Sequence, residues 1–290
     1  MCGIVAYIGK QNASSIIVDG LKKLEYRGYD SAGLAILENG RIELRRMAGR
    51  IDKLATLIKE KPLNGTLGIG HTRWATHGAP SEANAHPHLS MSGKIVIVHN
   101  GIVENYLSLR EELLTKGVTF RSETDTETIA HLIDLYYAKH DNLLSAVQNT
   151  LKRLQGAHGI VVMSCDEPDK LIAARLGNAG GIAIGVGQGE MFLASDVPAI
   201  IAHTHNVAFL ESGQIATISA DGYSVQDLDG QTIKLKTQNI PWDPVSAEKG
   251  SYAHFMHKEI HEQVRALSNT LSGRIDFERS RVVLPSLNVD

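Results

Sequence analysis

Short stretches rich in apolar residues alternate with polar breaks along the first 240 residues of the chain. Near the start, this pattern predicts four strands, which lie at residues 2–9, 32–38, 41–47 and 67–72. Residues 12–26 instead have the character of an amphipathic helix between the first two strands. The beginning of the chain therefore predicts mixed α and β structure.

The centre of the chain predicts two consecutive helices that face a core. Apolar residues recur at helical spacing in two sets: Ile129, Leu132, Ile133, Tyr136 and Tyr137, then Leu143, Val147, Leu151 and Leu154. Further strands follow at residues 159–164, 171–176, 181–186, 190–195, 207–212 and 214–219. Gly, Asn or Asp separates them, as is typical of antiparallel hairpins. These elements indicate an α+β fold with two sheets between helical layers.

The strand pattern breaks near residue 240, where two prolines occur among small and polar residues. We therefore predict a first domain at 1–240, a linker at 241–250 and the truncated start of another domain at 251–290. The last part carries one apolar stripe at helical spacing: Met256, Ile260, Val264, Leu267 and Leu271. Too few residues follow this stripe to cover it, so we expect a piece of a longer protein.

Composition excludes several classes of protein. The formal net charge is −3, which disfavours a broad basic surface for nucleic acid. The two cysteines, Cys2 and Cys165, form no C-x-x-C pair, which argues against a disulfide framework or structural zinc and fits a reducing compartment. No signal peptide or membrane-length apolar run is present. We therefore predict a cytoplasmic protein with no membrane partner.

Cys2 lies directly behind the initiator methionine and becomes the first residue when Met1 is removed. Its α-amine, with a reference pKa of about 7.7, can then take the proton of its own thiol, with a reference pKa of about 8.5. One residue would supply both nucleophile and base. The alternative is a small residue that starts a buried strand, and position alone does not decide between the two.

Several motifs resemble one known family. They are "MCGIV" at the start, "LEYRGYDSAG" at 24–33, "HTRWATHG" at 71–78, "NAHPH" at 84–88, "HNGIVEN" at 99–105 and "SETDTE" at 122–127. In this order they resemble the glutaminase domain of the glutamine–fructose-6-phosphate aminotransferases. These enzymes are class II glutamine amidotransferases and N-terminal nucleophile hydrolases. The resemblance implies a four-layer αββα sandwich and hydrolysis of L-glutamine through a γ-glutamyl thioester on Cys2.

The resemblance also implies how glutamine is held. Arg73 would clamp the α-carboxylate, a task suited to the planar guanidinium fork, and Asp125 would face the α-ammonium. Thr76 and His77 would line the same loop. Without the family, Arg73 would be a surface ion pair, and the run from Thr124 would be a helix-capping box that includes Asp125.

Attack on the amide carbon creates an oxyanion, and the resemblance assigns its donors to Asn100 and Gly101. Loss of one such donor typically slows turnover by about 10²–10³. Without the family, these residues would form a turn after the strand at 94–98. By the same resemblance, Trp74 would seal a covered route for ammonia and Arg27 would lie near the nucleophile, whereas each is otherwise a packing residue.

Other groupings predict neither a cofactor nor a metal site. Five histidines crowd one stretch of the chain, namely His71, His77, His86, His88 and His99. Their spacing matches no zinc-binding pattern, and two of them fall where the family has loop histidines. The "GVGQGE" run at 185–190 precedes a strand, so it predicts a hairpin and not a phosphate loop. We expect Cys165 to be a packing residue.

The resemblance implies partners that belong to the longer enzyme. Residues 251–290 resemble the opening of an isomerase half, which binds fructose 6-phosphate and receives the ammonia, and the full-length form would be a homodimer. One alternative is another class II amidotransferase, such as an amidophosphoribosyltransferase or an asparagine synthetase. Another is a non-catalytic glutamine-binding domain, because with Met1 retained the nitrogen of Cys2 is an amide and no base.

Overall fold

The computed structural model describes residues 2–76, 78–140, 142–241, 252, 255–272, 274–276 and 281–282. The chain divides into two compact units, Met1–Pro244 and Val245–Asp290, and we describe each by itself. Most of the predicted linker, residues 242–250, lies outside the described residues. The domain boundaries given above therefore stay a prediction.

An eight-stranded sheet, sheet A, forms one half of the first unit. Its strands stand in the order β15-β11-β9-β10-β1-β4-β2-β3, and every pairing is antiparallel. Their bounds are Gln238–Asn239, Asn206–Phe209, Ala183–Val186, Met191–Ala194, Gly3–Ile8, Leu67–Arg73, Ser31–Glu38 and Arg41–Ala48 in that order. The first strand of the chain therefore lies in the interior of the sheet.

A seven-stranded sheet, sheet B, forms the other half, with the order β14-β13-β12-β8-β7-β6-β5. These pairings are also antiparallel. The strand bounds, in the same order, are Thr232–Ile233, Gly222–Asp227, Gln214–Ser219, Leu171–Leu176, His158–Ser164, Ile95–Gly101 and His88–Leu89. Chain segments from 183 to 194 and from 206 to 209 return to sheet A, so the two sheets share one continuous chain path.

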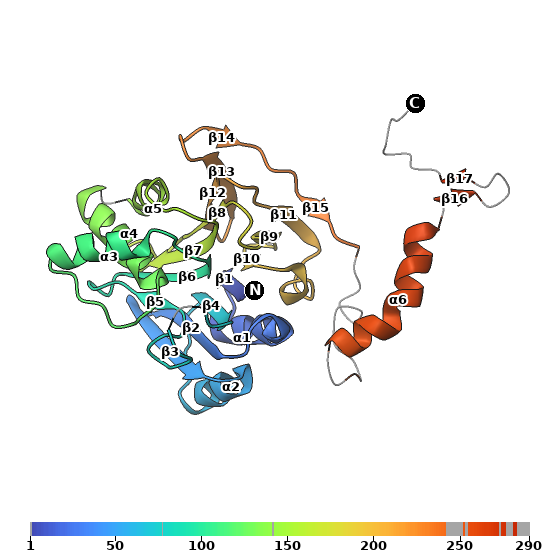
Figure 1. Ribbon diagram of the computed structural model, residues 1–290, viewed down its shortest axis with the longest axis horizontal. Coiled ribbons are helices and arrows are strands. Elements are labelled where there is room, and N and C mark those ends of the chain that lie inside the picture. Colours follow the sequence, from blue (N-terminus) through green and yellow to red (C-terminus); the bar gives the residue numbers. More distant parts are fainter. Residues whose placement is uncertain are drawn as a thin grey trace. The chain divides into compact units, whose positions relative to one another are not determined.

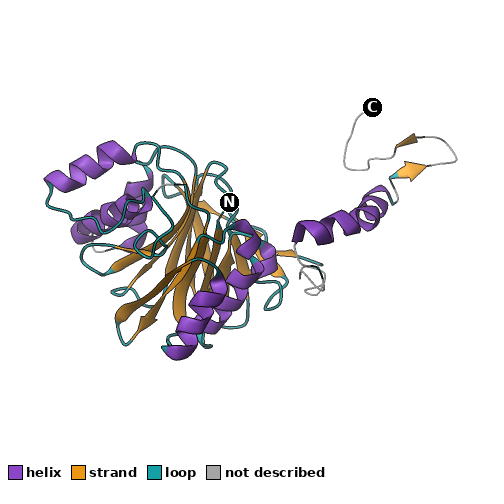
Figure 2. Ribbon diagram, turned by 60° about the horizontal axis from the view of Figure 1, so that its bottom comes forward, coloured by secondary structure: helices purple, strands orange, loops and turns teal. Residues whose placement is uncertain are grey.

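Helices cover the outer face of each sheet. Their bounds are α1 Ala13–Lys23, α2 Ile51–Glu60, α3 Tyr106–Thr115, α4 Thr126–His140 and α5 Leu143–Leu151. Helices α1 and α2 pack on sheet A, whereas α3, α4 and α5 lie on the side of sheet B (Figure 1). Figure 2 shows strands between helices on both sides. The α+β class and the four-layer αββα arrangement are confirmed.

The core between the sheets comes from alternate residues of each strand. In β1 these are Ile4, Ala6 and Ile8, and in β6 they are Val96 and Val98, all of them buried. Their neighbours point the other way: Ile95 and Ile97 pack against α4 and α5 in a second core. Because side chains alternate across a strand, each sheet keeps one face for its partner sheet and one for its helices.

The strands and helices predicted from the pattern are present, with small differences at their ends. The helix expected at 12–26 ends at Lys23 and is followed by a 3₁₀ turn at Glu25–Arg27. The run at 185–190 is a hairpin between β9 and β10, as predicted. The pattern missed α2 and α3. In α3 only Leu109 and Leu113 are buried, and exposed leucines elsewhere on the helix mask its periodicity.

The second unit contains α6, at Phe255–Leu271, and two short paired strands, β16 at Ile275–Asp276 and β17 at Arg281–Val282. The helix confirms the predicted apolar stripe. Its five apolar side chains are between 46% and 77% exposed among the described residues. No helix in the described part of the chain is long and apolar enough to cross a membrane.

Replacement of Leu193 by alanine tests the core between the sheets. Leu193 lies in β10 and is fully buried, so Leu193→Ala should lower the free energy of unfolding by about 2–5 kcal/mol, through lost apolar contact and a cavity. Chemical denaturation measures this change. As a control, Leu107→Ala, which changes an exposed side chain on α3, should alter the free energy of unfolding by less than about 0.5 kcal/mol. Equal effects would contradict the layered packing.

Candidate active site

Polar residues continue the inward-facing rows of three strands at one end of the sandwich. Cys2 precedes the row of β1, His71 and Arg73 continue the row of Leu67 and Ile69 in β4, and Asn100 continues the row of β6. The apolar part of each row packs in the core between the sheets. Its polar end therefore meets the polar ends of the other rows, and the site is built where the core stops.

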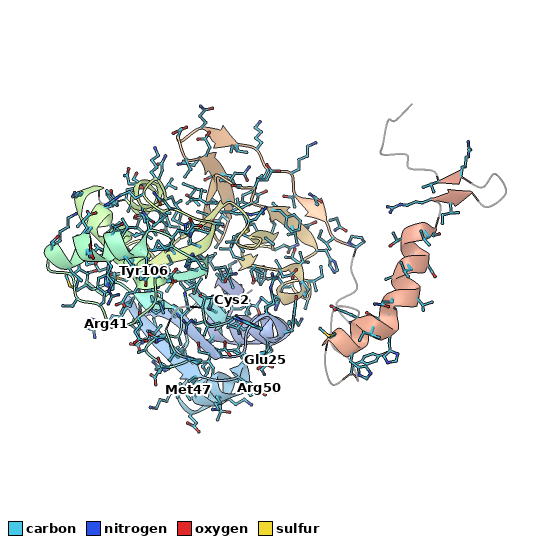
Figure 3. The ribbon with its side chains drawn as sticks, viewed as in Figure 1. Cys2, Glu25, Arg41, Met47, Arg50 and Tyr106 are labelled. Carbon is cyan, nitrogen blue, oxygen red and sulfur yellow. The ribbon has the colours of Figure 1, made fainter. Side chains whose placement is uncertain are left out.

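A cavity of about 360 Å³ lies at this end of the first unit. Among the predicted site residues it is lined by Cys2, Arg73, Trp74, Thr76, Asn100, Gly101 and Asp125. In Figure 3, Cys2 lies at the centre of the unit beside the start of β1, whereas the labelled Arg41 and Tyr106 lie towards its edge. Residues from positions 2 to 125 thus meet around one space.

The Cys2 thiol is held by the chain that follows β4. The backbone N–H of Trp74 donates to Sγ at 3.2 Å, and Sγ lies 3.6 Å from the carbonyl oxygen of Trp74. Burial raises the pKa of the thiol, while the Trp74 N–H and the positive charges of Arg73 and Arg27 act in the opposite direction. Because the pKa is raised overall, the thiol needs a base before it can attack.

Contacts with the segment after Arg27 fix the backbone around Trp74. The backbone N–H of Asp30 donates to the Arg73 carbonyl at 3.0 Å, and the Asp30 carboxylate accepts from the Ala75 N–H at 2.8 Å. Gly28 packs so closely that a Cβ there would lie 2.6 Å from the carbonyl carbon of Arg73. Residues of the "YRGYD" and "HTRWATHG" motifs therefore contact each other and together fix the backbone that holds the Cys2 thiol.

Asn100 and Gly101 belong to β6, so the expectation of a turn at these residues is wrong. The strand continues because Asn100 pairs with Gly159 and Gly101 with His158 in β7. Asn100 is buried, and its Nδ2 donates to the carbonyl oxygen of Cys2 at 3.1 Å. Gly101 has φ of 136°, and a Cβ there would lie 2.1 Å from the Ala157 carbonyl oxygen, so only glycine fits.

Asp125 lies at the start of α4 and is 4% exposed. Its Oδ2 accepts from the Val103 backbone N–H at 2.7 Å, which fixes one carboxylate oxygen beside the cavity. The predicted capping box from Thr124 is wrong. The Glu127 carboxylate accepts from backbone N–H groups of Arg121 and Ser122 instead, so it ties α4 to the preceding loop.

Arg73 is buried, and one of its guanidinium nitrogens, Nη2, donates to the Gly78 carbonyl at 3.3 Å. It faces the same cavity as Asp125, so a positive and a negative group border one space. Arg27 does not line the cavity. Its Nη1 pairs with the Asp196 carboxylate at 2.7 Å. The positive charge of Arg27 still acts to lower the pKa of the Cys2 thiol. His77 lies outside the described residues.

Five buried histidines lie at or behind the cavity: His86 and His99 line it, whereas His71, His88 and His158 do not. Burial is the main cause that lowers the pKa of each, to about 3 for His71 and His88. All five are therefore neutral at physiological pH. The described residues contain no group of three or more His, Cys, Asp or Glu side chains arranged to hold a metal ion.

One chain of hydrogen bonds sets the ring protons of three of these histidines. His158 Nε2 lies 3.1 Å from the Gln155 carbonyl, which can only accept, so His158 Nδ1 must accept from His99 Nε2 at 3.1 Å. His99 Nδ1 then accepts from the Thr126 hydroxyl at 2.8 Å. That hydroxyl oxygen in turn accepts from His86 Nε2 at 3.0 Å. The chain links β7, β6, α4 and the loop before β5.

Comparison with known proteins agrees with this geometry. The family described as "Glutamine amidotransferase domain" matches residues 52–241. The chain belongs to the glutamine amidotransferase family. The resemblance inferred from the motifs is confirmed.

Individual relatives of this glutamine amidotransferase extend the match to the whole chain. Glutamine–fructose-6-phosphate aminotransferase (isomerizing) of Caldanaerobacter subterraneus subsp. tengcongensis is 48% identical over 289 residues, which are 100% of the chain and 47% of that protein. The protein of the same name from Pyrococcus horikoshii is 48% identical over 276 residues, 95% of the chain and 46% of that protein. The chain thus spans about half the length of these relatives.

Solved structures show the same fold. Glutamine phosphoribosylpyrophosphate amidotransferase from B. subtilis superposes with a TM-score of 0.68 at 26% identity, over 78% of this chain and 49% of that one. A glutamine aminotransferase class-II domain protein from Silicibacter pomeroyi gives a TM-score of 0.54 at 18% identity, over 78% and 99% of the two chains. The latter supports the fold alone.

The structure adds cavity residues that the motifs did not suggest. They are His86, His99, Ile102, Thr124, Thr126, Asn178 and Ala179. Several of them lie inside the recognised motifs, where their neighbours drew attention instead. Asn178 and Ala179 follow β8 and carry no recognisable motif, so only the three-dimensional structure brings them to this amidotransferase site.

The buried histidines predict how stability depends on pH. Their folded-state pKa lies below the unfolded value of about 6.5, so the unfolded chain binds more protons as pH falls below that value. The free energy of unfolding should decrease by up to about 1.4 kcal/mol per pH unit for each such histidine between about pH 6.5 and the folded-state pKa. For His71 and His88 this window extends down to about pH 3.

Chemical denaturation at several pH values between 7 and 5 measures this slope, above the range in which carboxylates titrate. In a matched variant, His88→Gln, the slope should be shallower by up to about 1.4 kcal/mol per pH unit. A free energy of unfolding that stays constant from pH 7 to 5 would contradict the buried, neutral cluster.

Replacement of Gly28 by alanine should disturb the thiol through the backbone. A Cβ at residue 28 would also lie 2.7 Å from the Trp74 nitrogen that donates to Cys2. Loss of one hydrogen bond of about 1 kcal/mol predicts about fivefold slower alkylation of Cys2 at neutral pH, measured by peptide mapping. Gly159→Ala, which adds a Cβ in ordinary van der Waals contact, is the control. Equal alkylation rates in both variants would contradict the role of Gly28 in holding the backbone at Trp74.

Proposed function

We propose that the chain hydrolyses L-glutamine to glutamate and ammonia. The observation that carries the proposal is the meeting of the Cys2 thiol, the Asn100 amide, Arg73 and Asp125 at one cavity in a glutamine amidotransferase fold. Arg73 would bind the substrate carboxylate and Asp125 its ammonium. A free amino acid carries both charges, so this pair selects glutamine over a glutamine residue within a peptide.

In the proposed reaction, the free α-amine of Cys2 takes the thiol proton and Sγ attacks the side-chain amide carbon. The oxyanion would accept hydrogen bonds from Asn100 Nδ2 and the Gly101 N–H. Collapse of this intermediate returns the proton to the leaving nitrogen, which departs as ammonia and leaves a γ-glutamyl thioester. Water then attacks the thioester, the amine takes its proton, and glutamate is released with the thiol restored.

The remaining residues have supporting roles in this proposal. Trp74 is 48% exposed at the cavity and stands 5.9 Å from the Tyr29 ring, where it would cover the route of departing ammonia. Thr76 and His77 would complete the same loop, and Arg27 would favour the thiolate from behind. No cofactor or metal enters any step.

We further propose that this chain is the glutaminase part of a longer enzyme that transfers ammonia to fructose 6-phosphate and makes glucosamine 6-phosphate. The names and the 48% identity of the longer relatives support this assignment over an amidophosphoribosyltransferase, for which the structural match has 26% identity. Residues 1–240, 241–250 and 251–290 would then be the glutaminase domain, the linker and the start of the isomerase half. A homodimer and a cytoplasmic location remain predictions.

Cys2 provides the decisive test. Cys2→Ala should reduce the release of glutamate from glutamine to background, a loss of at least about 10³-fold, because no other group supplies the nucleophile. Cys165→Ala, which removes the other free cysteine, should retain activity. Intact mass must first show that Met1 has been removed, since only then is the amine free. A processed, folded chain that releases no glutamate would reject the proposal.

A further inference from the structure

A side-chain amide helps an oxyanion only if its nitrogen faces the charge. Asparagine carries an oxygen and a nitrogen of similar size on the same carbon, and nothing in the residue itself decides which of them faces the cavity. For Asn100 this choice is critical, because an oxygen at that position would repel the developing negative charge. Some neighbouring group must therefore fix the amide.

His71 is the neighbour in position to do so. Its Nε2 lies 3.1 Å from the carbonyl oxygen of His99 and 3.1 Å from Oδ1 of Asn100. A carbonyl oxygen can only accept, so Nε2 must carry the hydrogen, and that hydrogen is shared between the two oxygens. The ring nitrogen can therefore face only the acceptor end of the Asn100 amide.

The surroundings of His71 keep this arrangement in place. The ring is fully buried and stacks on the His86 ring with centroids 4.2 Å apart and planes 24° apart. Its Nδ1 has no hydrogen-bond partner among the described residues, which suits an unprotonated acceptor better than a buried N–H donor. Burial lowers the pKa of His71 to about 3, so the ring is neutral and carries one hydrogen at physiological pH.

The opposite end of the amide gives an independent reading of its orientation. Nδ2 of Asn100 lies 3.1 Å from the Cys2 carbonyl oxygen, and only the NH2 group can donate there. A flipped amide would place two acceptor oxygens against each other at Cys2 and two donors against each other at His71. The NH2 group has two hydrogens, so one can hold Cys2 while the other faces the substrate.

We propose that His71 is a positioning residue for the glutaminase reaction: its Nε2–H holds Oδ1 of Asn100, so that the NH2 group faces the oxyanion. This inference rests on the proposed function. His71 does not line the cavity, so it would act through Asn100. Its effect should therefore fall on the chemical step and disappear when the Asn100 amide is removed.

The test is a double-mutant cycle in the processed chain. His71→Phe keeps a stacked ring but removes the donor, and it should lower kcat for glutamine hydrolysis by about 10²-fold with KM changed less than about threefold, because a misplaced oxyanion donor affects the transition state. In an Asn100→Ala background the same change should alter kcat less than about threefold. Equal losses in both backgrounds, or a loss confined to KM, would overturn the proposal.

Two amide variants separate the hydrogen bond from the packing. The side-chain nitrogen of Gln reaches about as far as Nε2 of histidine, whereas that of Asn is one methylene shorter. His71→Gln should therefore keep kcat within about tenfold of the parent, and His71→Asn should lose about 10²-fold. These variants decide the matter if the Phe variant does not fold. His131→Phe, a buried histidine outside the cavity lining, is the control for stability loss without a selective loss of kcat.

Nuclear magnetic resonance separates failure of this inference from failure of the proposed function. ¹⁵N spectra of the parent chain should show the hydrogen of His71 on Nε2, and the side-chain NH2 signals of Asn100 should shift in the His71→Phe variant. If the parent releases no glutamate but shows these signals, the function is wrong and the positioning contact stands. A hydrogen on Nδ1 of His71 would refute the contact whatever the activity.

Discussion

Two sheets packed face to face leave each strand with one row of side chains in a dry core and one row towards the helices. In this chain the inward rows end in polar residues at the same edge of the sandwich, so Cys2, Arg73 and Asn100 meet there. The apolar part of each row anchors its polar end. The positions of the groups in the proposed reaction therefore follow from the packing of apolar residues that take no part in the chemistry.

The same packing determines which groups at the site are charged and which are neutral. The buried histidines at and behind the cavity are neutral, so they orient their neighbours through hydrogen bonds without adding positive charge to the site. The charged groups face the cavity instead, with Arg73 and Asp125 available for the two ends of an amino acid. In a site of low polarity, such fixed charges and dipoles act more strongly than they would in water.

Support for the Cys2 thiol comes from segments that are distant in sequence. The backbone at Trp74 holds the thiol, the turn from Gly28 to Asp30 holds that backbone, and Asn100 holds the carbonyl of Cys2. The proposed reaction needs a base such as the α-amine, because burial raises the pKa of the thiol. The position of Cys2 thus depends on contacts with strands of two different sheets.

The sequence by itself determined the class of fold and most strands and helices, because the alternation of apolar and polar residues is a local property. The motif residues that surround the cavity came from the resemblance to a known family. The sequence could not show that Asn100 and Gly101 extend a strand, that Glu127 ties α4 to a loop, or that Asn178 reaches the cavity. The partners of the buried histidines were also decided by tertiary structure alone. Each of these features depends on contacts between residues far apart in the chain, and hydrogen-bond direction follows only from which donor meets which acceptor.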